Sequence, residues 1–303
     1  MHYNQRTINT PVECTGVGVH SGKPATLTIK PAPPNHGIKF KRTDLVNAPS
    51  IPALFKMVTD TSLATVLGNN GAIVSTIEHL MACFTGLSID NAMVEVNAYE
   101  MPIMDGSALP FVEMINVAGI EEQDAPRCFF IIKEPIEISE DGKFVGVYPS
   151  DAFKISCTIE YEEALIGTQS FSMTVEETPF ADEISSARTF GFYHEYEFLK
   201  QHGLARGGSL ENSVVIDGKT VLNQDGLRFP DEFIRHKVLD CIGDFSLLGM
   251  PLLGHVVAHK SGHLFNHKLL QEIFHRKENW DTGFPDYADI QPVAPRAAKS
   301  LAL

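Results

Sequence analysis

Apolar and polar positions alternate within residues 4–40 in four short runs, QRTIN, VECTGVGVHSG, ATLTIKPA and GIKFKR. Turn residues separate the runs, at Gly22-Lys23 and at the cluster Pro33-Pro34-Asn35. Alternation with a period of two is typical of half-buried strands, so this segment predicts an antiparallel sheet. Strand-like runs return at 129–138, 144–148 and 153–161, around the turn Asp141-Gly142-Lys143.

Two longer segments, 75–87 and 229–249, carry apolar residues at spacings of three and four, which predicts buried helices. The apolar positions are Ile77, Leu80, Met81 and Phe84 in the first and Val238, Leu239, Ile242 and Phe245 in the second. The second helix is expected to end at Gly249, because glycine is common just past a helix end. Shorter helices are expected over 110–118 and 191–203.

The order of these elements suggests two halves of similar construction. An acidic run with a proline at 121–128 predicts a boundary, which gives a first α+β domain at 1–125 and a second at 126–303. Because each half has strands around a glycine-lysine turn and then a helix with a histidine near its start, we infer a distant duplication. An apolar insert at about 190–223 interrupts the second domain, and a frayed tail is expected at 292–303.

Composition narrows the class of protein. The chain has 303 residues, 44% of them hydrophobic, so it can fill the cores of one large or two ordinary domains. A net charge of -14 argues against a nucleic-acid or anionic-membrane surface. Five scattered cysteines without a CxxC pair argue against a disulfide framework and against a thiolate zinc site. With neither an apolar signal segment nor a membrane-length apolar run, we expect a soluble cytoplasmic protein.

The predicted helix at 229–249 also has a regular polar stripe, formed by His236, Asp240 and Asp244 at intervals of four. His236 and Asp240 can reach one metal ion, and His79 on the other helix would complete a three-ligand site with open positions. The alternative is a solvated helix face. Glu78, beside His79, is a candidate general base, but Ser75-Thr76-Ile77-Glu78 also fits a capping box, which we favour on this motif alone.

The segment 259–267 and its surroundings offer further polar groups. His263 could protonate a leaving amine with Asp244 fixing its tautomer, although a lone histidine is more often structural. Lys237 and Lys260 could hold a phosphate near the metal, or could be solvent lysines. Thr189 could donate to an oxyanion, or could be a turn hydroxyl.

Several motifs in order resemble the UDP-3-O-acyl-N-acetylglucosamine deacetylases, zinc enzymes of lipid A synthesis in Gram-negative bacteria. The resemblance covers nearly the whole chain and rests on TGVGVHSG at 15–22, STIEHLMA at 75–82, PIMDGSALPF at 102–111, SARTFGF at 186–192, GLARGGSLENSVV at 203–215, LNQDGLRFPDEFIRHKVLDCIGD at 222–244 and KSGH at 260–263. It implies two similarly built α+β domains, each with an insert, whose helices face each other across the active site.

The resemblance also implies roles for individual residues. Zn(II), with Fe(II) as the alternative, would be held by His79, His236 and Asp240. Glu78 would be the general base on the zinc water and His263 the general acid, supported by Asp244. The remaining implied roles are Thr189 as oxyanion donor, Lys237 and Lys260 near the UDP phosphates, Tyr161 stacked on the uracil, and an acyl passage lined by Phe190, Phe192, Tyr196, Leu204 and Val215.

The implied partner is therefore UDP-3-O-acyl-N-acetylglucosamine, with no nucleic acid and no integral membrane segment, and a monomer is expected. Two other classes remain open. Two histidines and a carboxylate also form the metal triad of non-haem iron oxygenases. A non-catalytic lipid- or nucleotide-binding protein with structural histidines is the third interpretation, and it would need no metal.

Overall fold

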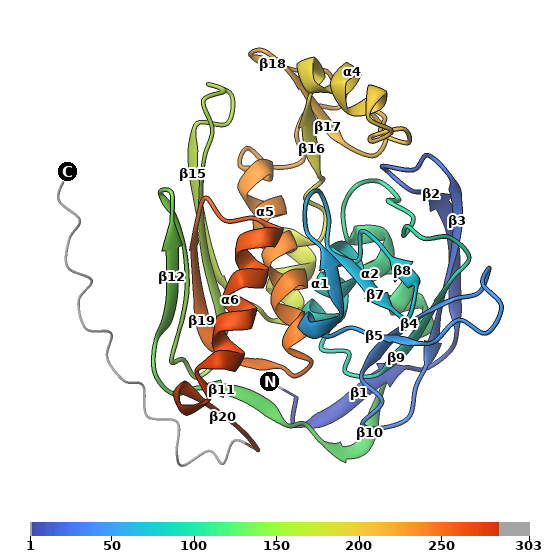
Figure 1. The fold of residues 1–303 in the computed structure, drawn as a ribbon, viewed down its shortest axis with the longest axis vertical. Coiled ribbons are helices and arrows are strands. Elements are labelled where there is room, and N and C mark those ends of the chain that lie inside the picture. The colour runs from blue at the N-terminus through green and yellow to red at the C-terminus, as the bar shows by residue number, and fades with distance from the viewer. Residues whose placement is uncertain (1, 285–303) are drawn as a thin grey trace.

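The computed structural model describes residues 2–284, and Figure 1 shows its arrangement. The tail expected at 292–303 lies outside the described residues. Two sheets flank a central group of helices that includes α1 and α5 (Figure 1).

The first half is built on a five-stranded sheet with the strand order β2-β3-β9-β4-β5. Neighbouring strands are antiparallel except β4 and β9, which are parallel. The strands are β2 (Val12–Val17), β3 (Pro24–Pro31), β4 (Ile38–Arg42), β5 (Ile51–Pro52) and β9 (Ala92–Val96), and the helices are α1 (Glu78–Gly86) and α2 (Leu109–Ala118).

The second half is built on a seven-stranded sheet in which β19 is central. β13 pairs with β19 in the antiparallel sense and β14 pairs with it in the parallel sense, while β11 joins its first residues. The elements are β11 (Phe129–Ile132), β12 (Ile136–Glu140), β13 (Lys143–Tyr148), β14 (Phe153–Glu160), β15 (Thr168–Thr174), α5 (Glu232–Phe245), β19 (Leu252–His259), α6 (His263–His275) and β20 (Trp280–Gly283).

The two halves repeat one topology. The path β12-β13-β19-β14-β15 has the same sequence of antiparallel and parallel pairs as β2-β3-β9-β4-β5. One helix precedes the central strand in each half, α1 before β9 and α5 before β19, and one helix follows it. The predicted α+β fold of two similarly built domains is therefore confirmed, whereas the boundary between 125 and 126 stays a prediction.

Smaller elements complete each half. A three-stranded sheet of β6, β7 and β8 forms an insert in the first half, and β16, β17 and β18 with α4 form the insert in the second. β1 pairs with β10 beside the junction of the halves. Their bounds are β1 (Asn4–Ile8), a 3-10 helix at Phe55–Met57, β6 (Val58–Asp60), β7 (Val66–Asn69), β8 (Ala72–Val74), β10 (Ile120–Pro126), α3 (Glu177–Pro179), a π-helix at Phe180–Ile184, β16 (Phe190–Phe192), α4 (Tyr193–Gln201), β17 (Val214–Asp217), β18 (Thr220–Val221) and 3-10 helices at Ser246–Leu248 and Lys277–Asn279.

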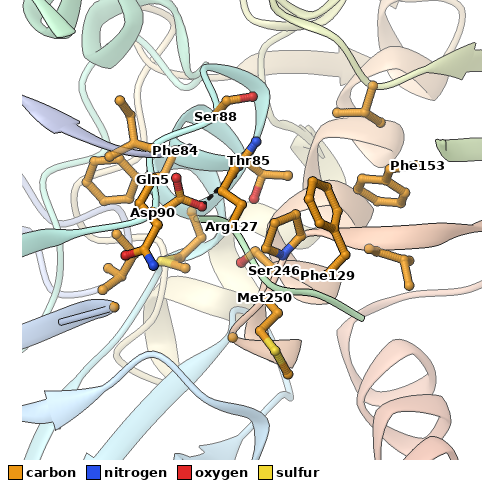
Figure 2. Close-up of a pocket in the computed structure, with 18 of the residues that line it drawn as sticks. Gln5, Phe84, Thr85, Ser88, Asp90, Arg127, Phe129, Phe153, Ser246 and Met250 are labelled. Carbon is orange, nitrogen blue, oxygen red and sulfur yellow. Dashed lines mark hydrogen bonds and ion pairs between the residues drawn. The ribbon is translucent and has the colours of Figure 1, made fainter. Parts of the chain in front are cut away.

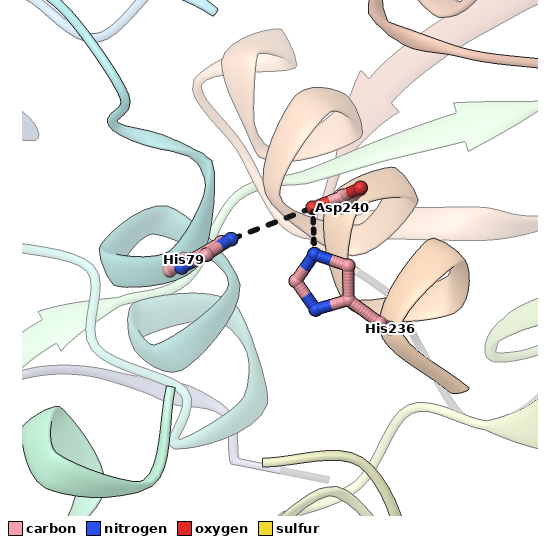
Figure 3. A group of neighbouring side chains, drawn as sticks. All are labelled: His79, His236 and Asp240. Carbon is pink, nitrogen blue, oxygen red and sulfur yellow. Dashed lines mark ion pairs between the residues drawn. The ribbon is translucent and has the colours of Figure 1, made fainter. Parts of the chain in front are cut away.

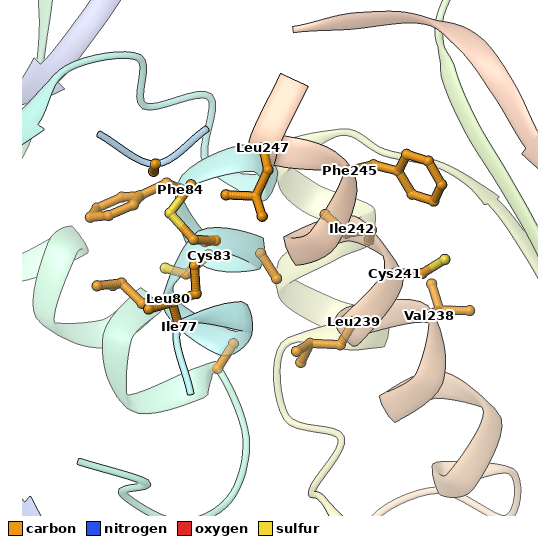
Figure 4. Packing of buried hydrophobic residues seen from close by; sticks show 14 of the residues in the cluster. Ile77, Leu80, Cys83, Phe84, Val238, Leu239, Cys241, Ile242, Phe245 and Leu247 are labelled. Atoms are coloured by element: carbon orange, nitrogen blue, oxygen red, sulfur yellow. The ribbon is translucent and has the colours of Figure 1, made fainter. Parts of the chain in front are cut away.

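The apolar faces predicted for the two long helical segments are buried. Ile77, Leu80, Phe84, Leu239 and Leu247 all belong to the buried core. In Figure 4, Leu80 and Phe84 lie on the side of the first helix away from the second, whereas Leu239 points toward the first. The second helix is shorter than expected. It begins at Glu232 rather than near residue 229, and a 3-10 turn follows it before Gly249, whose φ of +80° ends the helical run.

The capping box expected at 75–78 is wrong. The helix begins one residue after Ile77, and Thr76 has a φ of +62°, so the chain turns sharply before the helix. Within the described chain, no side chain caps this helix start, and the Glu78 carboxylate accepts a hydrogen bond from the backbone of Thr65 instead.

Two other expectations concern cysteines and membranes. All five cysteines belong to the described part of the chain, and each is a free thiol, as expected. Among residues 2–284, no helix combines the length and apolar character needed to cross a membrane.

A cavity of about 810 Å³ lies at the junction of the halves, at the C-terminal ends of α1 and α5. Figure 2 shows Phe84, Phe129, Ser246 and Met250 around it. Two of its charged lining residues are paired with each other, because Arg127 Nε donates to Asp90 Oδ1 at 2.8 Å. The described residues that line it include none of the predicted site residues, so the chemistry predicted from the sequence lies elsewhere.

Glycine allows α1 and α5 to approach closely. A Cβ placed on Gly243 in α5 would lie 2.2 Å from the carbonyl oxygen of Glu78, closer than such atoms can come. Gly86 of α1 allows a second close approach, to the π-helix at Phe180–Ile184, because a Cβ on Gly86 would lie 2.2 Å from the Phe180 ring. Gly243 thus sets the spacing of the two helices.

Replacing Gly243 by alanine tests this spacing. Because the added methyl must push α1 away from α5, we expect Gly243→Ala to lower the free energy of unfolding by about 1–3 kcal/mol, measured in urea, and to weaken metal binding. Gly191→Ala is the control, since among the described residues no heavy atom lies within 4 Å of a Cβ built there. Equal stabilities for the two variants would contradict the close-approach explanation.

Candidate metal and catalytic site

Three buried side chains from α1 and α5 converge on one point. His79 lies in the first turn of α1, and His236 and Asp240 lie one turn apart on α5, as Figure 3 shows. Each offers a ligand atom, and these atoms all lie within 4.8 Å of one another. Asp240 Oδ1 is 3.7 Å from His79 Nε2 and 3.4 Å from His236 Nε2. The three predicted ligands are therefore brought together.

The protonation states of these groups suit a metal ion. Burial lowers the pKa of His79 to about 3 and also lowers the pKa of His236, so both imidazoles are neutral near pH 7. Burial acts to raise the pKa of Asp240, but His236 and Lys237 outweigh it and hold that pKa well below its usual range. Neutral imidazole and ionised carboxylate are the forms that bind metals.

Neighbouring groups orient two of the three ligands. His236 Nδ1 donates to the carbonyl oxygen of Ala187 at 3.0 Å, which leaves Nε2 free to bind. Lys237 Nζ donates to Asp240 Oδ2 at 2.8 Å, which leaves Oδ1 toward the histidines. Hydrogen bonds of this kind fix the tautomer and direction of metal ligands. Two imidazoles and one carboxylate with open positions are the donor set of a catalytic zinc site, so the residues fit the metal.

Glu78 is a buried carboxylate next to His79. Its side chain is 4% exposed, and its Oε2 accepts the Thr65 backbone N–H at 3.1 Å. Burial raises the pKa of Glu78 to about 7, against the opposing charge of His263. A carboxylate with a pKa near neutrality can both accept and release a proton at pH 7, which is what a general base requires.

His263 begins α6 and faces Glu78 across the site, with 3.8 Å between its Nε2 and Glu78 Oε1. Its Nδ1 donates to Asp244 Oδ2 at 2.9 Å. Burial acts to lower the pKa of His263, but the negative charges of Asp244 and Glu78 outweigh it and raise that pKa to about 10. The ring is therefore protonated near pH 7, with Nδ1 hydrogen-bonded to Asp244.

Thr189 is held by backbone contacts from both halves. Its N–H donates to the carbonyl oxygen of Gly106 at 2.8 Å, which explains the motif PIMDGSALPF as a support for this segment. Two residues earlier, the Ala187 carbonyl accepts the hydrogen bond from His236. One short segment thus carries both the ligand-orienting carbonyl and the expected oxyanion donor.

Comparisons with known proteins identify the family of this chain. The family model of UDP-3-O-acyl N-acetylglycosamine deacetylase matches residues 5–275. The chain belongs to this family.

Curated relatives with the name UDP-3-O-acyl-N-acetylglucosamine deacetylase cover almost the whole chain. The protein of Myxococcus xanthus is 54% identical over 99% of this chain and 93% of its own length. Those of Syntrophus aciditrophicus and Teredinibacter turnerae are 44% and 47% identical, over 92% and 96% of this chain and 89% and 96% of their own lengths.

The three residues expected to hold the nucleotide differ in their distance from the candidate metal ligands and in their exposure. Lys237 Nζ lies 5.5 Å from the centre of the Phe190 ring, close to the ligands. Lys260 is 39% exposed and forms an ion pair with Glu160. The Tyr161 ring lies 5.8 Å from Phe190 and 6.0 Å from Phe192, so it belongs to an aromatic cluster at the base of the insert.

The residues expected to line the acyl passage lie on the insert and are all partly exposed: Phe190, Phe192, Tyr196, Leu204 and Val215. The register of β16 and β17 divides them. Phe190 pairs with Val214 and Phe192 with Ile216, whereas Val215 pairs with Gly191. Because side chains alternate between the faces of a sheet, Val215 lies on the face opposite Phe190 and Phe192. These five assignments stay predictions.

The structure adds residues that the sequence did not suggest. Thr65 and Asn266 both donate to Asp244, at 2.6 and 2.8 Å. Glu232, fully buried at the start of α5, accepts four hydrogen bonds, three from Arg188 and one from the Arg228 backbone. The sequence held a signal for the Arg188–Glu232 pair, since each residue belongs to a motif that also contains a predicted site residue, Thr189 or His236.

Removing the Glu232 carboxylate tests its support of the site. Glu232→Ala leaves Arg188 buried without its partner, so we expect a loss of about 3–5 kcal/mol in unfolding free energy. Metal affinity should fall about 10-fold to 100-fold because the Ala187 carbonyl is no longer held in place. Urea unfolding and metal titration measure the two effects.

Asp231→Ala is the matched control at the same helix end, because Asp231 pairs with Arg235 and is 34% exposed. An exposed pair of this kind contributes only about 0–1 kcal/mol. If the two variants lost the same stability and metal affinity, the role given to Glu232 would be wrong.

Proposed function

We propose that this protein hydrolyses the N-acetyl group of UDP-3-O-acyl-N-acetylglucosamine. The products are acetate and UDP-3-O-acyl-glucosamine, and the reaction is the committed step of lipid A biosynthesis. One group of neighbouring side chains in the structure supports the proposal. A buried three-ligand set lies beside a carboxylate with a pKa near 7 and a histidine held protonated by Asp244. The names of relatives at 44–54% identity supply the substrate.

His79, His236 and Asp240 would hold Zn(II), or Fe(II) as the alternative. Bound there, the metal would lower the pKa of a water molecule and polarise the amide carbonyl. The protein prepares for this by keeping two imidazoles neutral and one carboxylate ionised in a buried site. It also directs His236 Nε2 inward through the hydrogen bond from Nδ1 to Ala187.

Glu78 accepts the proton of the attacking water. The charge of its carboxylate is destabilised by burial, so the proton is taken up readily at pH 7. The Thr65 N–H holds Oε2, while Oε1 lies on the side of His263. Proton acceptance and proton donation therefore occur on neighbouring groups.

His263 and Thr189 act on the atoms of the substrate amide. Addition of water makes a tetrahedral carbon with a negative oxygen, which the Thr189 hydroxyl and the protonated His263 stabilise. His263 then transfers its Nε2 proton to the sugar nitrogen as the C–N bond breaks, and the amine leaves. Asp244 keeps Nδ1 protonated and the ring in one orientation throughout.

Substrate binding uses the groups that border the site. Lys237, and Lys260 on release from Glu160, would contact the diphosphate, and Tyr161 would stack on the uracil. The acyl chain would run along the insert past Phe190, Phe192, Tyr196, Leu204 and Val215. We expect the protein to act as a monomer, and we place it in the cytoplasm with its nucleotide-sugar substrate.

Metal removal tests the proposal directly. A chelator should abolish acetate release from UDP-3-O-acyl-N-acetylglucosamine, and one equivalent of Zn(II) should restore it, because water is activated at the metal. Folding is followed in parallel by circular dichroism. Folded protein that releases no acetate in either state would refute the proposal, and oxygen consumption with a 2-oxo acid would then favour an iron oxygenase.

Single substitutions separate metal binding from proton transfer. Glu78→Ala and His263→Ala should retain the metal but lower kcat about 100-fold to 10,000-fold, since each removes one proton-transfer group. His236→Ala should lose both metal and activity. Metal content by atomic absorption and acetate release give the two readouts. Activity in a metal-free His236→Ala protein would exclude the assigned ligand set.

A further inference from the structure

Thr65 contacts the proposed base and the proposed acid at the same time. It immediately precedes β7 in the first half and is 2% exposed. Its N–H donates to Glu78 Oε2 at 3.1 Å, and its hydroxyl donates to Asp244 Oδ1 at 2.6 Å. The same hydroxyl oxygen lies 3.3 Å from His263 Nδ1. One residue therefore joins groups from both halves of the fold, through its backbone N–H to Glu78 and through its hydroxyl to Asp244 and His263.

The carbonyl of Thr65 is also engaged, at the start of α1. It accepts the backbone N–H of Thr76 at 3.1 Å, and the N–H of Ile77 lies 3.5 Å away. These bonds fix Thr65 relative to the first turn of α1, which carries Glu78 and His79. Because the backbone N–H, the carbonyl and the hydroxyl of Thr65 all form hydrogen bonds, the fold sets the direction of the hydroxyl toward Asp244.

The hydroxyl completes the set of donors around Asp244. Asp244 Oδ2 accepts from His263 at 2.9 Å and from Asn266 at 2.8 Å, while Oδ1 accepts from Thr65. Donors on both oxygens prevent rotation of the carboxylate about its bond to the chain. A fixed carboxylate fixes the plane of the His263 ring, and hence the direction in which Nε2 presents its proton.

We propose that Thr65 is a positioning residue that couples the base to the acid. This inference rests on the function proposed above. It adds Thr65 as a residue that acts on proton transfer through Glu78, Asp244 and His263 without touching the substrate. Its loss should therefore change the rate of the chemical step and leave substrate affinity and metal content unchanged.

Three substitutions at this position test the coupling. Thr65→Val keeps the shape and the backbone N–H but removes the hydroxyl, so kcat should fall about 10-fold to 100-fold, the range typical of an orienting hydrogen bond. KM and bound zinc should be unchanged, because the Thr65 hydroxyl contacts Asp244 and His263 and none of His79, His236 and Asp240. Thr65→Ser restores the hydroxyl and should restore kcat. Thr65→Ala is a second hydroxyl-free variant in case valine impairs folding.

Thr7→Val is the matched control. Thr7 is 3% exposed, and its hydroxyl donates to the carbonyl of Asn91 at 2.7 Å, so the substitution also removes a buried threonine hydrogen bond. Its kcat should equal that of the wild type. A wild-type kcat in Thr65→Val, a rise in KM with kcat unchanged, or an equal fall in Thr7→Val would each overturn the inference.

A second readout is independent of activity. The His263 Nδ1 proton, held by Asp244, should give a downfield NMR resonance in the zinc-loaded protein, assigned by its loss in His263→Gln. Thr65→Val should shift or broaden this resonance, and Thr65→Ser should not. If the wild type released no acetate, the proposed function would fail, and the resonance would still decide whether Thr65 positions His263. An unchanged resonance in Thr65→Val would refute that role.

Discussion

The close approach of α1 to α5 is the constraint on which the rest of the site depends. Backbone meets backbone at Gly243 and Glu78, where even a methyl group would lie 2.2 Å from a carbonyl oxygen. Only at this spacing do His79 from one helix and His236 and Asp240 from the other bring ligand atoms within 4.8 Å of one another. Burial of the apolar residues shown in Figure 4 stabilises the packing of the two helices. The packing of the helices therefore also sets the distances between the candidate metal ligands.

Charges inside the site are arranged so that neighbouring groups keep different protonation states. Asp240 is stabilised as a carboxylate by His236 and Lys237, whereas Glu78, with burial dominating, has a pKa of about 7. Two histidines are neutral and the third, His263, is protonated because Asp244 lies against it. Similar side chains thus take the different protonation states that the proposed roles of ligand, base and acid require, because their surroundings differ.

The sequence predicted the parts of the site that follow local periodicity. His236, Asp240 and Asp244 share a helix, so their common face could be inferred from spacing alone. Glu78 was ambiguous because a capping box has the same residues, and only the φ of Thr76 and the contact with Thr65 decide against it. Thr65 could not be predicted as part of the site, since it lies 179 residues from Asp244 and immediately precedes a short strand, β7, with no motif around it. The repeated topology was suggested by patterns, but the strand pairing that proves it is non-local.

The division of the site between α1 and α5 also affects how the protein is made. The face of α1 that contacts α5 has no partner until α5 leaves the ribosome, because roughly 150 residues separate the two helices and synthesis proceeds at ~5–20 residues per second. For on the order of 10 s the nascent chain therefore carries His79 and Glu78 without His236 and Asp240. The complete set of candidate metal ligands forms only near the end of translation.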